Sequence, residues 1–422
     1  MPTTRRTFLK TVAATAAGSG TTTSAAPFGF VRQKRTLRVL GTHVTLQEPL
    51  RQQAQRDLGI DIQFEPGGSA QILHQASTRP KSFDLYEQWS NSIKVLWQAG
   101  SIQAIDIKRL DYWNEINDLT LTGKLTPEAN IGAGDAPNKL LYVQKNGEIG
   151  SNPTGKISFL PYVHNVDSFG YDADVVGKGI PYETESWSWL LDDRWKGRVA
   201  LVNEPTIGLF DAALAIQASG RASFEDIGDL TTQELDKLFR ILVELRKAGH
   251  FRGVWNSVPN SVDLMERGEA VIESMFSPAV FALKAKGTNC IYASPKEGYR
   301  AWHGVMCMSS ATEGANQEAA YEYMNWWLSG WPGAFIAKQG YYISNPQRSR
   351  KSLSDAEWDY WYDGQAAKQD LLGTDGQVVV KQGEIRDGGS YTKRFSRIAV
   401  WNTVMNNYEY SLPGWNEFLS AG

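Results

Sequence analysis

An alternation of strand-like and helix-like segments near the start of the sequence constrains the fold more than any other feature. Residues 37–40 predict a first strand, and apolar side chains then recur every fourth residue from 46 to 58, which predicts a helix. Gly59 follows this stripe, as expected where a helix ends. Residues 60–64 alternate apolar and polar side chains, which predicts a second strand. Repetition of this unit predicts an α/β fold, with mostly parallel strands and helices on both faces of the sheet.

Similar periodicities continue along the rest of the chain. Thr231 and Glu234 have the spacing of a capping box, which predicts a helix that begins there and ends at Gly249. Further helices are expected at 69–76, 93–99, from 186 and at 317–328. Further strands are expected at 83–86, 102–105, 157–171, 197–202 and 270–274. Residues 117–156 are rich in Gly, Asn, Pro and Thr, which predicts a long surface insertion.

Length and charge narrow the class of protein. A chain of 422 residues is too long for one ordinary core and suits two lobes of ~150–200 residues each. Because no segment has the composition of a flexible linker, we expect strands that cross between the lobes. The formal net charge of −3 argues against a nucleic-acid partner, which normally requires a basic excess. No run of ~18 apolar residues occurs, so no membrane-spanning helix is expected.

The two cysteines exclude a disulfide scaffold and iron–sulfur ligation. Cys290 and Cys307 both lie in segments that predict buried strands. A disulfide between them in an oxidising compartment and a pair of buried thiols are both compatible with the sequence.

Residues 1–26 resemble a bacterial twin-arginine export signal. Arg5 and Arg6 precede a weakly apolar stretch without acidic residues, and small residues before Pro27 suggest cleavage there. We therefore expect a mature protein in the periplasm, exported through the twin-arginine pathway. No cysteine lies near the cleavage point, so no lipid anchor is expected there.

Several short segments, taken in order, resemble one transport family. They are Phe83-Asp84-Leu85, Glu185–Leu190 leading into Trp195–Val199, Leu264–Ala270, Pro295–Gly298 before Trp302, and Gln339–Asn345. In this order and spacing they resemble the spermidine/putrescine-type periplasmic solute-binding proteins of ABC importers. The resemblance covers residues 36–346, with a weaker continuation toward residue 420.

This resemblance implies the two-lobe periplasmic binding protein fold (type II), with two mostly parallel sheets joined by crossing strands. Lobe 1 would comprise 36–163 plus 303–345, and lobe 2 would comprise 164–302. Helices and loops of 346–422 would pack on both lobes. Such a protein is not an enzyme: it closes about a hinge on a small-molecule ligand and delivers it to an ABC permease in the inner membrane. We expect a monomer without cofactor or metal.

Candidate ligand-binding residues follow from the ends of predicted strands and from the crossing strands. They are Thr42, His43, Trp89, Ser90, His164, Asp167, Glu204, Phe276, Trp302 and His303. Aromatic rings attract cationic ligands, and a carboxylate forms a charge-assisted hydrogen bond with an ammonium group. The residue types therefore predict an amine or another nitrogenous cation as the ligand.

Three departures from the polyamine-type pattern bear on the size of this ligand. Gly304 stands where the relatives carry a carboxylate two residues after a tryptophan, and Phe276 stands where they carry tryptophan. Asp167 stands where they carry a neutral residue. These changes favour a smaller or singly charged amine, or a nitrogen heterocycle, over a long diamine.

Other functions remain open at this point. Tyr341-Tyr342 resembles the tyrosine pair of ferric-iron binding proteins, and a carbohydrate receptor would share the same fold. A periplasmic carbohydrate-active enzyme would use the 15 Trp as sugar platforms and a carboxylate pair such as Asp192-Asp193 as catalysts. No nucleophile motif, zinc-binding His spacing or dinucleotide fingerprint supports an enzyme.

Overall fold

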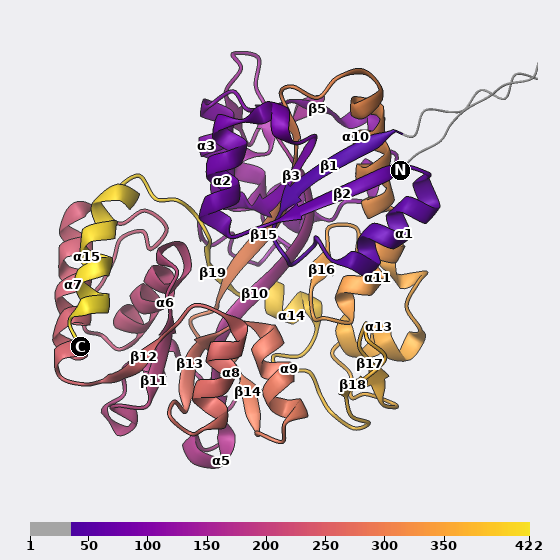
Figure 1. Ribbon diagram of the computed structural model, residues 1–422. Helices are drawn as coiled ribbons and strands as arrows, with labels where there is room; N and C mark the ends of the chain where they lie inside the picture. The colour runs from indigo at the N-terminus through magenta and orange to yellow at the C-terminus, as the bar shows by residue number, and fades with distance from the viewer. Residues whose placement is uncertain (1–34) are drawn as a thin grey trace, which may run out of the picture. The chain divides into compact units, whose positions relative to one another are not determined.

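The first strand–helix units form a parallel flank of a mixed sheet in the computed structural model, which describes residues 35–422 (Figure 1). Strand β1 (Thr36–Gly41) lies between β2 (Asp61–Pro66) and β3 (Leu85–Trp89) and pairs with both in parallel. The predicted alternation is confirmed here, although β3 begins two residues later than expected.

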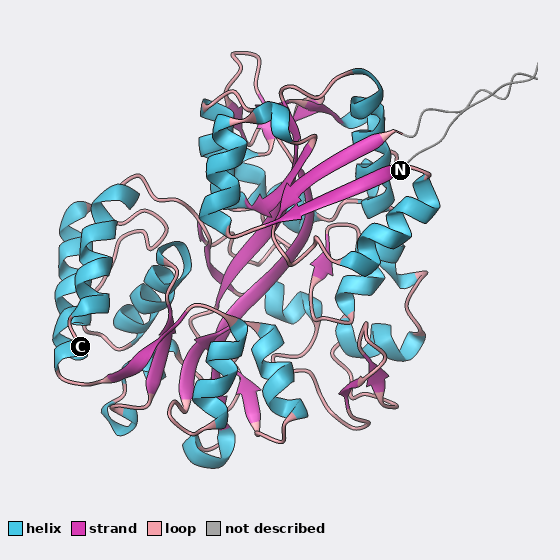
Figure 2. Cartoon of the chain, viewed as in Figure 1, coloured by secondary structure: helices cyan, strands magenta, loops and turns pink. Residues whose placement is uncertain are grey.

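Helices lie on both sides of this flank (Figure 2). Helix α1 (Glu48–Leu58) packs with α10 (Gly314–Leu328) on one side, and α2 (Ser69–Thr78) packs with α3 (Ile93–Gln98) on the other. The helices turn apolar residues toward the strands, and the apolar residues of β1, β2 and β3 are buried against them in one core.

Two long strands run through the middle of the sheet. Strand β10 (Leu160–Asp172) pairs antiparallel with β15 (Tyr299–Ser309), and all eleven residues of β15 are buried. On one edge β15 pairs with β3, and on the other β10 pairs with β13 (Ile272–Met275), both antiparallel. The predicted crossing strands therefore exist, and their mutual pairing merges the two expected sheets into one continuous path of hydrogen-bonded strands.

The second flank is again parallel. Strand β11 (Val199–Val202) pairs with both β12 (Phe251–Trp255) and β13. Helix α7 (Thr232–Lys247) begins with the predicted capping box and packs against α15 (Tyr408–Ser420). Helix α6 (Pro205–Ala218) was not predicted, because it is buried on all sides through most of its length and so shows no amphipathic period.

The C-terminal part contributes a core and a strand. Helices α13 (Asp355–Trp361) and α14 (Tyr391–Phe395) bury a cluster of aromatic side chains. Strand β19 (Ile398–Trp401) follows them and pairs in parallel with β15. The prediction of helices and loops alone for 346–422 is therefore incomplete, since this segment also extends the main sheet.

The segment 117–156, predicted as a surface insertion, is built into the body of the protein. Its strand β6 (Ala133–Gly134) pairs with β19, and Leu119 and Leu141 are fully buried. Four short strands form a separate sheet: β5 (Ile105–Asp106), β9 (Lys156–Ile157), β7 (Tyr142–Val143) and β8 (Ile149–Gly150). Two-residue strands carry no usable periodicity, so the sequence could not reveal them.

Smaller differences concern single elements. The strand predicted at 102–105 divides into β4 (Ile102–Gln103) and β5, which belong to different sheets. The helix predicted from residue 186 is a 3₁₀ helix, η6 (Trp187–Leu191). Cys290 and Cys307 are buried free thiols, so the disulfide alternative is wrong.

The predicted export signal, residues 1–26, and its cleavage before Pro27 lie outside the described residues. Within the described part of the chain, none of the helices combines the length and apolar character that a membrane span requires.

One carboxyl group in the second flank is buried without a charged partner. Glu273, on β13, is fully buried, and its Oε2 accepts a hydrogen bond of 2.8 Å from the Ser261 hydroxyl. Its Oε1 has no hydrogen-bond partner among the described residues. Burial raises the pKa of Glu273 to about 8, so the folded protein keeps this group protonated where the unfolded chain ionises it.

Because the folded pKa is raised, the stability that protonated Glu273 contributes is complete at acid pH and is lost as pH rises toward 8. The free energy of unfolding of the wild type should fall between about pH 5 and about pH 8. In Glu273→Gln this fall should be smaller by at least ~1.4 kcal/mol. Urea unfolding at both pH values measures this. Glu266→Gln, on the exposed side of the adjacent helix α8 (Val258–Glu266), is the control. Identical pH dependence in wild type and Glu273→Gln would contradict the prediction.

Candidate ligand-binding site

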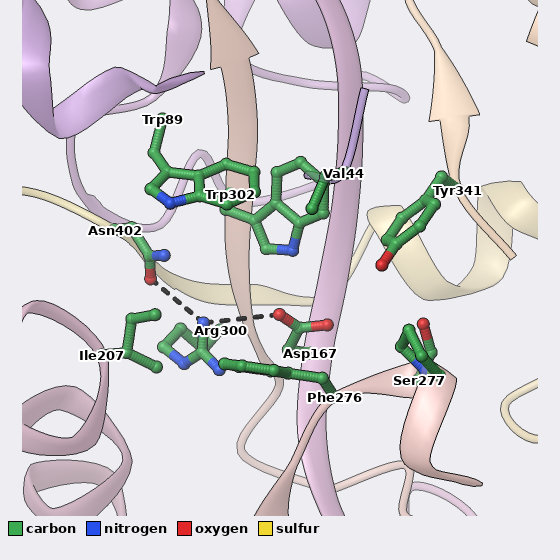
Figure 3. A pocket seen from close by; sticks show the side chains of 11 residues that line it. Val44, Trp89, Asp167, Ile207, Phe276, Ser277, Arg300, Trp302, Tyr341 and Asn402 are labelled. Carbon is green, nitrogen blue, oxygen red and sulfur yellow. Dashed lines mark hydrogen bonds and ion pairs between the residues drawn. The ribbon is translucent and has the colours of Figure 1, made fainter. Parts of the chain in front are cut away.

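A cavity of about 90 Å³ lies beside the crossing strands (Figure 3). Strand β10 supplies Asp167, which lies directly opposite Arg300 of β15 in the antiparallel pairing. Trp302 is two residues further along β15, and alternate residues of a strand project to the same face. The remaining lining residues are Val44, Trp89, Ile207, Phe276, Ser277, Pro278, Tyr341 and Asn402.

Strand ends from both flanks reach this cavity. Trp89 is the last residue of β3, Phe276 directly follows β13, and Asn402 directly follows β19. All three positions are carboxyl ends of strands, where open α/β sheets commonly bind ligands. The cavity therefore collects side chains from segments that are far apart in the sequence.

Aromatic rings form one wall. Trp89 and Trp302 meet edge to face with ring centroids 4.9 Å apart, and Tyr341 packs against Trp302 at 5.6 Å. Phe276 lies across the cavity from them, held edge to face against Trp255 at 5.0 Å. These contacts fix the rings in position without a ligand.

A buried guanidinium group forms part of the opposite wall. The Arg300 side chain is fully buried; its Nε donates to Asp211 Oδ1 at 2.7 Å and its Nη1 donates to Asn402 Oδ1 at 3.2 Å. Nη1 also lies 3.5 Å from Asp167 Oδ2 (Figure 3). Nη2 has no hydrogen-bond partner among the described residues.

Two carboxylates compensate this charge. Burial raises the pKa of Asp211 to about 6, and Arg300 opposes that rise. Burial also raises the pKa of Asp167, against the opposing effects of Arg300, the Tyr292 hydroxyl and the Trp302 indole. Tyr292 donates to Asp167 Oδ1 at 3.0 Å. Asp167 and Asp211 therefore flank the guanidinium group from two sides, and burial opposes the ionisation of both carboxyl groups.

Four of the ten residues predicted from the sequence line this cavity: Trp89, Asp167, Phe276 and Trp302. Their role in ligand binding stays a prediction. The other six lie elsewhere, for reasons that differ from residue to residue.

The two histidines lie on the opposite face of the crossing strands. His164 and His303 are paired across β10 and β15, and each is an odd number of residues from Asp167 or Trp302 on its own strand. His164 Nε2 lies 2.8 Å from the Tyr391 hydroxyl within the C-terminal core, and His303 packs against Trp401. Burial lowers the pKa of both to about 3, so both are neutral interior residues.

The other four predicted residues lie near strand ends but outside the cavity. Thr42 and Ser90 are buried, and His43 is exposed. Glu204 is the N-cap of α6, where its carboxylate accepts a hydrogen bond of 2.9 Å from the Thr206 hydroxyl. A strand end places a residue near a ligand site, but it does not fix the direction of the side chain.

Several lining residues were missed. Arg300 had a usable signal, because it lies two residues before Trp302, and alternate residues of a strand share a face. Ser277 adjoins the predicted Phe276. Asn402 had no signal, since it is positioned by β19, and Ile207 lies on the unpredicted helix α6.

The tyrosine pair does not form a metal site. Tyr341 lines the cavity, but the Tyr342 hydroxyl donates to the backbone oxygen of Trp361 at 2.8 Å and lies in the C-terminal core. The two phenols point apart, so the ferric-iron alternative is wrong for this pair. Among residues 35–422, no cluster of three or more His, Cys, Asp and Glu side chains is arranged to hold a metal ion.

Comparison with known proteins assigns the chain to a family. Residues 50–360, more than half of the chain, match the bacterial extracellular solute-binding proteins. The chain belongs to this family. No curated protein sequence matches it.

Solved structures show the same fold as this solute-binding protein. The spermidine/putrescine substrate-binding protein PotD of Streptococcus pneumoniae has a TM-score of 0.60 at 15% identity, covering 92% of this chain and 98% of that one. The PotD lipoprotein of Treponema pallidum has a TM-score of 0.63 at 11% identity, covering 91% and 99%. An ABC transporter protein of Clostridium perfringens has a TM-score of 0.57 at 16% identity, covering 91% and 100%. The two-lobe periplasmic binding protein fold, expected from the sequence motifs, is confirmed.

Family and fold define a general role. The protein is a bacterial extracellular solute-binding protein, and the structures that share its fold include substrate-binding proteins of ABC transporters. Proteins of this extracellular family act outside the cytoplasm, and the Treponema pallidum neighbour is a lipoprotein.

The buried charges of the cavity yield a stability prediction. Asp211→Ala should lower the free energy of unfolding by ~3–5 kcal/mol, because Arg300 would lose its nearest carboxylate in a site that water does not reach. The double variant Asp211→Leu/Arg300→Met should regain only part of this loss, because the unpaired guanidinium is removed but the buried Asp167 then loses Arg300 as its partner. Urea unfolding measures both.

The matched control is Asp193→Ala, whose side chain is 86% exposed and lies 4.0 Å from Arg221. It should change the free energy of unfolding by less than ~0.5 kcal/mol. An Asp211→Ala variant as stable as this control would show that Arg300 does not depend on Asp211.

Proposed function

We propose that this solute-binding protein captures a small organic solute with an amine or another nitrogenous cation in the cavity beside the crossing strands. The observation that carries the proposal is the position of Asp167, a buried carboxylate beneath the rings of Trp89, Trp302 and Tyr341 (Figure 3). Aromatic faces and a carboxylate together form a favourable environment for a desolvated ammonium group.

The charge of the cavity supports a cationic group on the ligand. Two buried carboxyl groups, Asp167 and Asp211, lie beside the single guanidinium group of Arg300. A positive group on the ligand would pair with Asp167, which lines the cavity and is not fully compensated by the more distant contact with Arg300. The pKa of Asp211, about 6, implies that this attraction strengthens as pH rises through that value.

The volume of the cavity supports a small ligand. A space of about 90 Å³ suits a molecule of few non-hydrogen atoms better than an extended polyamine. The structural relatives from Streptococcus pneumoniae and Treponema pallidum are named for polyamine transport. The ligand proposed for this chain carries an amine, as polyamines do, but is a shorter molecule.

The remaining parts of the proposal concern the whole protein. Residues 1–26 direct export through the twin-arginine pathway, and the mature protein works as a periplasmic monomer. Residues 36–163 with 303–345 form lobe 1, residues 164–302 form lobe 2, and 346–422 packs on both. The lobes close on the ligand by bending of the crossing strands.

A ligand panel tests this function. Small primary amines, amino acids, neutral sugars and ferric citrate are titrated against the mature protein, and the shift in melting temperature is measured. An amine-bearing compound should raise the melting temperature by linkage. Trp302→Ala should weaken its binding at least about fivefold by calorimetry, because a ring over the cation is lost.

Trp113→Ala is the control for loss of an aromatic side chain, because Trp113 is partly exposed and does not line the cavity. Asp167→Asn should weaken binding of cations and leave neutral compounds unaffected. Stabilisation by a neutral sugar that ignores Asp167→Asn would overturn the proposed ligand class. Conversion of any oligosaccharide to products would overturn the role as a receptor.

A further inference from the structure

One end of the Arg300 guanidinium has nothing to bind. Its Nε and Nη1 are occupied by Asp211, Asn402 and Asp167, but both N–H groups of Nη2 lack a partner among the described residues. The side chain is fully buried and lines the cavity. Buried donors without partners are rare in native proteins, and at the wall of a cavity such a donor indicates a missing acceptor.

A second feature of the same wall favours an acceptor with negative charge. Helix α9 (Ser277–Ala285) begins at the cavity, where both Ser277 and Pro278 line it. No side chain caps this helix, and its first turn contains no acidic residue. The partial positive charge of a helix N-terminus and the Ser277 hydroxyl are therefore available to an anionic group that also reaches Arg300.

We infer that the solute carries a carboxylate in addition to its amino group, so that the ligand is a small zwitterion of the amino-acid type. The carboxylate pairs with Arg300 Nη2 at the start of α9, and the ammonium group lies between Asp167 and the aromatic wall. This inference rests on the proposed function, because it keeps the amine at Asp167 and adds a second group to the same ligand.

The arrangement of charges disfavours a ligand that carries only the amine or only the carboxylate. A simple amine neutralises Asp167 but leaves Nη2 unpaired and buried. A simple carboxylic acid satisfies Nη2 but lies close to Asp167, which is only 3.5 Å from the guanidinium. A compact zwitterion presents opposite charges a short distance apart, which matches the short distance between Arg300 and Asp167.

Matched ligands test this without altering the protein. Glycine, β-alanine and 4-aminobutanoate are each compared by calorimetry with the corresponding amide, which masks the carboxylate, and with the alkyl acid that lacks the amine. For one of these chain lengths, the amino acid should bind at least about tenfold more tightly than its amide and than the corresponding alkyl acid. An amide that binds as tightly as its amino acid would overturn the inference and leave the proposed amine-binding function intact. An alkyl acid that binds as tightly would overturn both.

Variants locate the carboxylate. Ser277→Ala should weaken binding of the amino acid several-fold while binding of its amide is unchanged. Arg300→Lys, which keeps the charge and loses the second terminal nitrogen, should abolish the preference for the amino acid over the amide. Should Arg300→Lys not fold, Ser277→Ala and the wild-type ligand series still decide the matter. An unchanged preference in both variants would overturn the assignment to this wall.

Discussion

The charge of Arg300 lies where solvent does not reach, and much of the surrounding structure follows from the need to compensate it. Asp167 faces it from the neighbouring crossing strand, Asp211 approaches from α6, and Asn402 approaches from the end of β19. Three segments from distant parts of the sequence thus meet at one guanidinium. Removing a buried charge partner is costly, so this group ties the crossing strands to the second flank and to the C-terminal segment.

The same group links fold and binding. Because the two crossing strands pair antiparallel, Asp167 and Arg300 lie opposite one another, and Trp302 shares their face. The aromatic wall then closes over a pair of opposite charges, of which Arg300 has an incomplete set of hydrogen bonds among the described residues. A solute-binding protein must hold its ligand and also release it. A preformed cavity with one unpaired donor suits the first task, since the ligand would supply the acceptor that the described residues lack.

How much of this could be predicted differs between the fold and the site. Strong local signals predicted helices correctly. The apolar stripe of α1 ends at Gly59, and the capping box of α7 marks its first turn, and both depend only on residues close together in the sequence. Helix α6 was missed because complete burial removes its amphipathic period. At the site, strand ends led to Trp89 and Phe276, and position on a crossing strand led to Asp167 and Trp302. The same reasoning failed for His164 and His303 because it ignored the alternation of side chains, and Asn402 depended on a pairing between residues a hundred positions apart.

The most direct measurement is a crystal structure of the mature protein purified with the solute that it retains. We expect density for a small molecule in the cavity between Trp302 and Arg300, with a nitrogen near Asp167. A solute bound instead in another hollow, such as the one lined by Asn203, Trp255 and Arg267, would contradict the central claim that the crossing strands carry the binding site.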